Sequence, residues 1–231
     1  MAKSLFIILF SFCFLFSKAK ENSYVSPDYS LIKKLTKDKN SEYYYPLLFS
    51  RYQKMDTTLK ANDYKMLYYG YFFQSSYIEQ GSSAFYNDSI RQIMHKDQLT
   101  QQEWKKLIYL VNNYMQTAPF DLQKVKLLFV AYHNINDEYN ASLYRTRLEM
   151  LIKTILATGD GKTEKSAFHV LQVGDEYAIV SILGFDFTGE EVTTENKCDF
   201  LKVANNMDGL KGIYFDVNQI IVQLKQMMKV D

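Results

Sequence analysis

The sequence predicts an α+β protein in which stacked antiparallel helices precede a small antiparallel β-sheet with a C-terminal helix. Apolar residues recur at helical spacing up to about residue 157, and β-branched runs bounded by turn residues follow them. Helical spacing then returns at the end of the chain. We therefore expect a helical-hairpin array over residues 20–158 and a β-part over residues 159–231 that packs on it.

The helical part is predicted from caps and apolar stripes. Thr100 and Glu103 form a capping box, which satisfies free backbone N–H groups at the start of a helix. Pro46 suits the first turn of an earlier helix, and Asn62 or Asp63 can cap one that runs through "DYKMLYYGYFF". Three stripes have the 3.6-residue period: Trp104, Leu107, Ile108, Val111 and Met115; Leu122, Val125, Phe129 and Tyr132; Tyr144, Leu148, Leu151, Ile152 and Ile155. Short polar breaks between the predicted helices favour antiparallel neighbours.

The β-part is predicted from runs of β-branched and aromatic residues. In "AFHVLQVGDEYAIVSIL", residues 167–183, two such runs flank Gly174 and Asp175, which predicts a hairpin. "CDFLKV" from Cys198 and "GIYFDV" from Gly212 predict further strands, because a turn-rich segment separates them. The final "NQIIVQLKQMMK" has helical spacing and predicts the terminal helix.

The first 19 residues predict a signal peptide. Lys3 precedes an apolar run over residues 5–16, and the small residues Ser17 and Ala19 stand where a signal peptidase cleaves. The run is shorter than the roughly 20 residues of a membrane-spanning helix, and no later segment approaches that length. We therefore expect a soluble exported chain, periplasmic or extracellular, that starts at Lys20 and has no membrane span.

Cysteine and charge content limit the other classes. Lipoprotein anchoring at Cys13 is not expected, because a lipid-attachment cysteine follows a small residue and Phe12 stands there. Without the signal peptide, Cys198 is a single thiol that cannot form an intramolecular disulfide. The chain has 27 basic and 26 acidic residues, and loss of Lys3 and Lys18 leaves a net charge of −1. This balance does not indicate a nucleic-acid partner.

The segment "TGDGKTEKSAF", residues 158–168, contains the "GKT" of a phosphate-binding loop. Such a loop requires a glycine where Leu156 stands and a strand before it, whereas the pattern predicts a helix there. We therefore expect no nucleotide. The segment instead predicts a junction, in which Gly159 ends the helix in the left-handed conformation and Asp160 with Gly161 turns the chain into the first strand.

Several features taken together resemble a known family. They are "LYYGY" at 67–71, "GDGKTEKSAFHV" at 159–170, the "CDFL" strand from Cys198 and "IYFDV" at 213–217. In this order they are similar to a family of exported proteins from Bacteroides-type bacteria, known as the domain of unknown function numbered four-nine-one-nine. The resemblance covers nearly the whole mature chain. It implies export, and it supplies no catalytic residues, cofactor or ligand.

Candidate chemistry therefore depends on residue types alone. The three histidines, His95, His133 and His169, have no metal-ligand spacing, so neither a metal site nor a cofactor is expected. Six acidic residues near the predicted sheet could supply the paired carboxylates of a hydrolase: Asp160, Asp175, Glu176, Asp186, Glu190 and Glu191. Their spacing does not place them together, and solvated turn residues are the simpler interpretation.

The sequence contains 19 tyrosines and 16 phenylalanines, which can form a core or an exposed recognition surface. Core packing is the simpler interpretation of Tyr68 and Tyr71, which share a helix face. The candidate binding residues are Asp160, Asp175, Glu176, Tyr68 and Tyr71. Two functions are open at this point. The first is a non-enzymatic protein of the bacterial cell envelope that binds an envelope protein or glycan, and the alternative is an envelope hydrolase that uses carboxylates near the helical/β junction.

Overall fold

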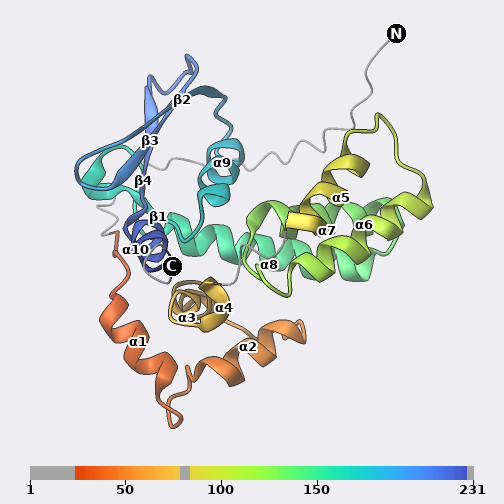
Figure 1. The fold of residues 1–231 in the computed structure, drawn as a ribbon, viewed down its shortest axis with the longest axis horizontal. Coiled ribbons are helices and arrows are strands. Elements are labelled where there is room, and N and C mark those ends of the chain that lie inside the picture. The colour runs from red at the N-terminus through yellow and green to blue at the C-terminus, as the bar shows by residue number, and fades with distance from the viewer. Residues whose placement is uncertain (1–23, 79–83, 228–231) are drawn as a thin grey trace.

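The computed structural model describes residues 24–78 and 84–227, and the predicted signal peptide and Cys13 lie outside them. The described helices are α1 (Tyr29–Lys37), α2 (Tyr45–Gln53), α3 (Ala61–Tyr71), α4 (Ser75–Ile78), α5 (Ala84–Met94), α6 (Gln101–Tyr114), α7 (Leu122–Asn134), α8 (Glu138–Leu156), α9 (Val173–Ile182) and α10 (Asn218–Met227). The strands are β1 (Phe168–His169), β2 (Phe187–Thr193), β3 (Cys198–Val203) and β4 (Gly212–Asp216). Helices dominate the N-terminal part and strands follow, which confirms the predicted α+β class (Figure 1).

Capping explains where the predicted helices begin. At the start of α6, Thr100 Oγ1 accepts the Glu103 N–H, and the Glu103 carboxylate accepts the Thr100 N–H. Asp121 and Asp137 cap α7 and α8 by accepting a backbone N–H three residues further on. Pro46 lies in the first turn of α2, as predicted. Each of the helices α5 to α8 packs against its neighbour in the chain, which confirms the predicted array of helices.

Helix α3 lies between α1 and α2 and also packs against α8 (Figure 1). A Cβ atom on Gly70 would lie 2.9 Å from Thr36 Cγ2, so the glycine permits the close approach of α1. The predicted cap of this helix was wrong, because Lys60 occupies the N-cap position. Asp63 lies in the first turn instead, where its carboxylate accepts the Lys60 N–H.

The β-part is a four-stranded sheet in the order β1-β4-β3-β2. Strands β2, β3 and β4 are antiparallel to their neighbours, and the predicted strands from Cys198 and Gly212 are confirmed. The fully antiparallel prediction was wrong in one place, because β1 pairs parallel to β4, with Phe168 opposite Phe215. A parallel pair needs a long connection, which the segment from α9 to β3 provides.

The predicted hairpin over residues 167–183 was also wrong. Only Phe168 and His169 form a strand, and the segment after Gln172 is helix α9. Asp175 and Glu176 lie in the first turn of α9, where carboxylates suit the positive end of the helix dipole. Gly174 and Asp175, read as a turn in the sequence, therefore begin a helix. Helix α9 packs between α7 and β2, so it joins the two parts of the fold.

The junction between α8 and β1 differs from the prediction at one residue. Helix α8 ends at Leu156, and Gly161 rather than Gly159 has the left-handed conformation, with φ of 68°. Gly159 is required for a different reason, because a Cβ atom there would lie 2.0 Å from the Ser166 carbonyl oxygen. The Ser166 carbonyl accepts the Asp160 and Gly161 N–H groups, so the loop is closed across Gly159.

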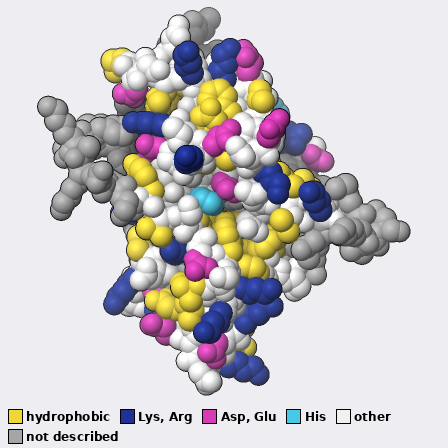
Figure 2. All heavy atoms as spheres, turned by 90° about the vertical axis from the view of Figure 1, so that its left-hand side faces the viewer, with side chains coloured by type: hydrophobic (Ala, Val, Ile, Leu, Met, Phe, Trp, Pro, Cys, Tyr) yellow, Lys and Arg dark blue, Asp and Glu magenta, His cyan; other side chains and the backbone are white. Residues whose placement is uncertain are grey.

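Two surface properties bear on possible partners. Within residues 24–78 and 84–227, no helix is both long enough and apolar enough to cross a bilayer. On the face shown in Figure 2, basic and acidic side chains are interspersed, and hydrophobic side chains lie among them. This face therefore lacks the large basic patch that marks a nucleic-acid-binding surface.

Candidate functional site

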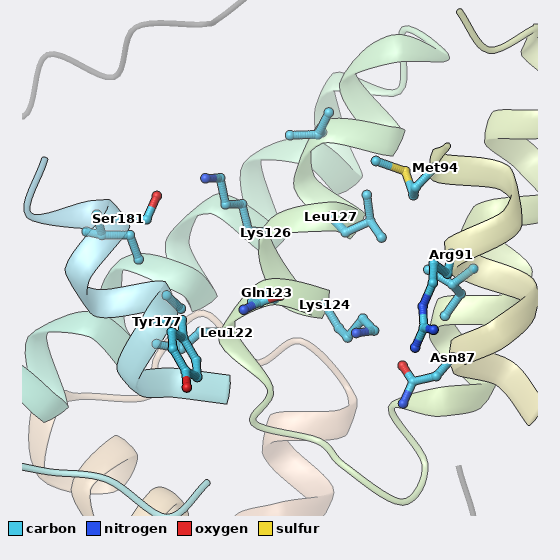
Figure 3. A pocket seen from close by; sticks show the side chains of 14 residues that line it. Asn87, Arg91, Met94, Leu122, Gln123, Lys124, Lys126, Leu127, Tyr177 and Ser181 are labelled. Atoms are coloured by element: carbon cyan, nitrogen blue, oxygen red, sulfur yellow. The ribbon is translucent and has the colours of Figure 1, made fainter. Parts of the chain in front are cut away.

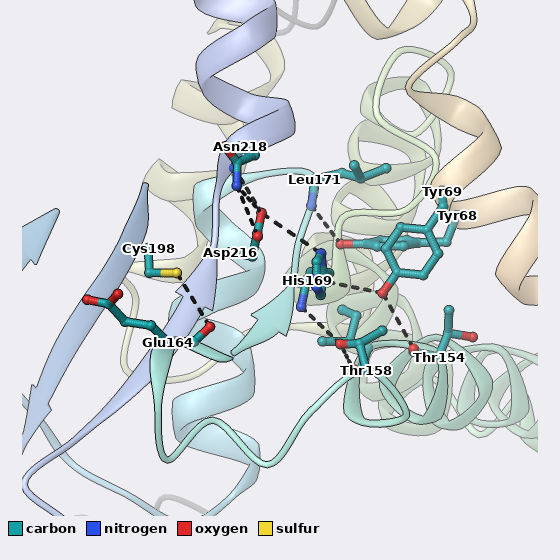
Figure 4. A network of polar contacts seen from close by, with 11 residues as sticks. Tyr68, Tyr69, Thr154, Thr158, Glu164, His169, Leu171, Cys198, Asp216 and Asn218 are labelled. Carbon is teal, nitrogen blue, oxygen red and sulfur yellow. Dashed lines mark hydrogen bonds and ion pairs between the residues drawn. The ribbon is translucent and has the colours of Figure 1, made fainter. Parts of the chain in front are cut away.

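Asp175 is the centre of a buried network that joins three helices. Its carboxylate accepts the Tyr68 hydroxyl at 2.6 Å, the Leu122 N–H at 3.2 Å and the Gln172 side-chain amide at 3.2 Å. The Tyr68 hydroxyl in turn accepts the Leu171 N–H at 3.1 Å, and Figure 4 shows Tyr68 directed toward Leu171. Both Asp175 and Tyr68 are fully buried. The two candidate residues therefore hold α3, α7 and α9 together and do not face a ligand.

This network predicts that Tyr68→Phe lowers the free energy of unfolding by about 2 kcal/mol, because the Leu171 N–H loses its acceptor and Asp175 loses a donor. Urea denaturation of the wild type and the variant measures the difference. Tyr109→Phe is the control, since Tyr109 is 66% exposed and should change stability by less than about 0.5 kcal/mol. Equal costs for the two variants would contradict the structural role of Tyr68.

Two more candidate residues have local partners. Tyr71 is buried, and its hydroxyl donates to the carbonyls of Thr117 and Ser76. Asp160 lies in the junction loop, where its carboxylate accepts the Lys162 N–H at 3.0 Å. Both side chains stabilise the backbone around them. Neither joins a group of candidate residues that could act on one ligand.

Glu176 lies beside two other carboxylates. Oxygens of Glu176 on α9, Glu191 on β2 and Asp199 on β3 all lie within 4.8 Å of one another. Glu176 and Asp199 are buried, whereas Glu191 is exposed. Burial and the neighbouring Asp199 and Glu191 charges raise the pKa of Glu176 to about 9. Of the six acidic residues considered from sequence, the structure brings together Glu176 and Glu191, and Asp199 was not among those considered.

The other acidic candidates lie apart from this cluster. Glu190 bonds to the ammonium of Lys202, at 2.8 Å to one oxygen and 2.9 Å to the other. Asp186 is exposed in the loop before β2. Asp175 belongs to the network with Tyr68. Within the described part of the chain, the cluster around Glu176 is therefore the one place where the acids considered for a hydrolase lie close together. A substrate would have to reach the Glu176 carboxylate, which is fully buried.

A second constellation crosses the sheet. His169, Asp216 and Cys198 occupy paired positions on β1, β4 and β3, and Figure 4 shows them around one another. Asp216 lies between the other two, with its Oδ1 3.9 Å from His169 Nδ1. Burial raises the pKa of the Cys198 thiol to about 11, and its sulfur contacts the Glu164 carbonyl. A nucleophilic cysteine needs a base beside a thiol of lowered pKa, so this group lacks the arrangement of a cysteine hydrolase.

A groove of about 640 Å³ lies between α5, α7 and α9. Figure 3 shows Arg91 and Asn87 of α5 on one side, Tyr177 and Ser181 of α9 on the other, and α7 residues between them. The apolar lining residues are Ile90, Met94, Leu122, Leu127, Val130, Ala178 and Ile182. This volume lies within the range of ligand pockets, about 300–1,000 Å³.

The charged residues of the groove are basic. Arg91, Lys124 and Lys126 line it, and none of its described lining residues is acidic. Lys124 Nζ lies 3.7 Å from Asp121 and 4.8 Å from the centre of the Tyr114 ring, so its position is fixed. Lys126 is exposed, and no ion pair involves it within the described part of the chain. Arg91 lies 3.8 Å from Asp88, so Lys126 is the groove cation that no described acid pairs with. The groove therefore combines an apolar lining with three basic side chains, which suits an anionic ligand.

Sequence reasoning did not identify this groove. The residues that form it come from three helices, and one of these helices was predicted as a hairpin. Leu122 was predicted as part of an apolar helix face, and its partners across the groove depend on how α5 and α9 pack against α7. The two lysines Lys124 and Lys126 beside Leu127 were the signal in the sequence, although such spacing is common on solvated helix faces.

The comparisons with known proteins bear on the family. Neither the curated proteins nor the solved structures gave a match to this chain. A family model described as "Domain of unknown function (DUF4919)" matches residues 30–227, which include the helices from α1 onward, the whole sheet and α10. The match covers most of the chain and confirms the family predicted from the sequence landmarks. The chain therefore belongs to the family of the domain of unknown function DUF4919.

Proposed function

We propose that the chain is an exported, non-enzymatic binding protein of the bacterial cell envelope, and that its groove between α5, α7 and α9 takes an acidic peptide segment of another envelope protein. The observation that carries this proposal is the combination of an apolar lining with Arg91, Lys124 and Lys126 and without a lining carboxylate in the described residues. Export rests on the signal peptide predicted over residues 1–19.

The lining favours a peptide over the other expected ligand, a glycan. Sugar sites present aromatic rings for stacking together with polar side chains, whereas Tyr177 is the only aromatic residue among the described lining residues. A peptide offers what the groove can bind. Its apolar side chains fit against Leu127 and Val130, its main-chain groups match the amides of Asn87 and Gln123, and its carboxylates pair with the cations.

The hydrolase alternative has less support. The groove has no carboxylate among its described lining residues, and Glu176, the acid of raised pKa, is fully buried. General acid catalysis requires the acid within hydrogen-bond reach of the substrate. A peptide bound in the groove would contact Tyr177, the residue after Glu176 in α9, and would not reach the Glu176 carboxylate.

The proposal predicts binding of an acidic amphipathic peptide and weaker binding of a basic one. The probe is a fluorescein-labelled peptide of alternating Glu and Leu, and the comparison is the same peptide with Lys in place of Glu. Fluorescence anisotropy should rise with the acidic peptide at low salt. The double variant Arg91→Glu, Lys126→Glu should weaken the affinity at least about tenfold, because it reverses two exposed charges beside the bound carboxylates.

Lys105→Glu, Lys106→Glu is the matched control, because both lysines are exposed on α6 and lie outside the groove. This double variant has the same net charge as the groove variant, so it separates a site from a general charge effect. Equal weakening by the two double variants would contradict a peptide site in the groove. Equal binding of the acidic and basic peptides would contradict the anionic ligand.

A further inference from the structure

The carboxylate cluster of Glu176, Glu191 and Asp199 has an origin in the sheet. Glu191 and Thr193 lie two residues apart on β2, and Thr193 pairs with Asp199 on β3. Alternate residues of a strand share a face, so Glu191 and Asp199 are diagonal neighbours on one side of the sheet. Helix α9 packs against β2 and places Glu176 beside them.

The buried carboxylate of Glu176 lacks a protein partner. Both of its oxygens are inaccessible to solvent, and neither has a hydrogen-bond partner among the described residues. An ionised carboxylate accepts several hydrogen bonds in water, and burial without replacements costs several kcal/mol. Glu176 therefore needs a proton or a cation beside it.

The two neighbouring carboxylates are oriented by hydroxyl donors. Tyr177 donates to Glu191 Oε2, and Thr193 donates to Asp199 Oδ1 at 2.6 Å. These bonds use one oxygen of each carboxylate and leave the other available. Within the described residues, no lysine or arginine forms an ion pair with any of the three acids. Three acidic groups thus converge without a protein cation to balance them.

We propose that Glu176, Glu191 and Asp199 bind a divalent cation, and that this cation is Ca²⁺. All three donors are carboxylate oxygens, which suit hard cations, and the cluster has no histidine or cysteine for zinc. Two oxygens on opposite sides of Ca²⁺ lie about 4.6–5.2 Å apart, so carboxylate oxygens within 4.8 Å of one another can share one Ca²⁺ ion. Ca²⁺ also accepts irregular coordination, whereas Mg²⁺ requires a near-ideal octahedron. Because Glu191 is exposed, a small ion can reach the cluster from solvent. A sugar or peptide is too large to reach the buried Glu176 beside it. The spacing of the histidines led to the expectation that the chain binds no metal. That spacing does not bear on a calcium site, whose ligands are carboxylates.

The test uses the full mature chain after treatment with EGTA. Addition of CaCl₂ at pH 7.5 should raise the melting temperature by several degrees, with half of the effect at about 10⁻⁴–10⁻³ M, the range of extracellular calcium modules. MgCl₂ at the same concentration should have a smaller effect. Terbium provides a second measurement, because Tyr177 beside Glu191 can sensitise its luminescence and Ca²⁺ should displace it.

The variants test the location of the site. Glu191→Gln changes an exposed side chain, so the variant should fold, and it should weaken Ca²⁺ binding at least about thirtyfold. Glu190→Gln is the matched control, because the adjacent Glu190 bonds to Lys202 and lies outside the cluster; it should leave the affinity unchanged. No Ca²⁺-dependent shift in the wild type up to 10 mM would overturn the proposal and indicate that Glu176 carries a proton. Equal Ca²⁺ affinity of wild type and Glu191→Gln would also overturn it.

Discussion

Gly159→Ala should lower the free energy of unfolding by at least about 3 kcal/mol, one of the largest effects of a single methyl group in this chain. The added Cβ would lie 2.0 Å from the Ser166 carbonyl oxygen and 2.7 Å from that of Ala167. Both atoms belong to the backbone, so a side-chain rotation cannot relieve the overlap. The loop between α8 and β1 would have to open, with loss of the bonds from the Asp160 and Gly161 N–H groups.

Gly174→Ala is the matched control for this prediction. Gly174 lies in the first turn of α9, and an added Cβ there meets no atom within 4 Å. Alanine favours a helix over glycine, so this variant should be about 0.5–1 kcal/mol more stable than the wild type. Guanidinium denaturation of the three proteins measures both changes. A cost below about 1 kcal/mol for Gly159→Ala would show that the junction is looser than the structure describes.

The second large effect is a dependence of stability on pH that originates at Asp175. Burial raises the pKa of Asp175 from 3.8 to about 7, against the opposing effect of the hydrogen bond from Tyr68. Between these two values the folded protein holds a proton that the unfolded chain has released. The contribution of Asp175 is therefore fully present below pH 4 and is lost as the pH rises through 7. The loss is on the order of 4 kcal/mol.

Asp175→Asn removes this dependence, because an amide does not ionise. The stability of the variant relative to the wild type should therefore increase by on the order of 4 kcal/mol between pH 4 and pH 8. Urea denaturation at unit pH intervals measures the difference, and Asp208→Asn, at an exposed position, should follow the wild-type curve. Parallel curves for wild type and Asp175→Asn would contradict a buried, protonated Asp175.

The elements with local signals could be predicted from the sequence. The capping box at Thr100 and the apolar stripe after it depend only on residues within one helix, and α6 begins where they indicate. Strands β3 and β4 were also predicted, because Gly and Asn residues bound their β-branched runs. In these segments the local preference and the tertiary contacts favour the same structure.

The elements that were missed have ambiguous or weak local signals. Ala178, Ile179 and Val180 on α9 are buried in succession, so this apolar run resembles a buried strand. Strand β2 has the opposite composition, since most of it is exposed and it contains an irregular pairing with β3 between Phe187 and Glu191. Only packing between α7 and the sheet identifies α9 as a helix.

The candidate sites depend on contacts between distant segments. Glu176 and Glu191 were candidate acids, yet their convergence with Asp199 requires the register of β2 with β3 and the position of α9. The abundance of tyrosine suggested an exposed recognition surface as well as a core. Tyr68 and Tyr71 belong to the core, where their hydroxyls satisfy buried polar groups.

The most direct measurement is an NMR titration of the mature chain, labelled at its Ile, Leu and Val methyl groups, with the acidic Glu-Leu peptide. A site in the groove predicts that the methyl resonances of Ile90, Leu127, Val130 and Ile182 shift together and saturate, because these residues line the groove on three helices. The methyls of Leu201 and Ile213, buried in the sheet outside the groove, should stay unchanged. Shifts that cluster away from α5, α7 and α9, or no shift at saturating peptide, would contradict binding in the groove.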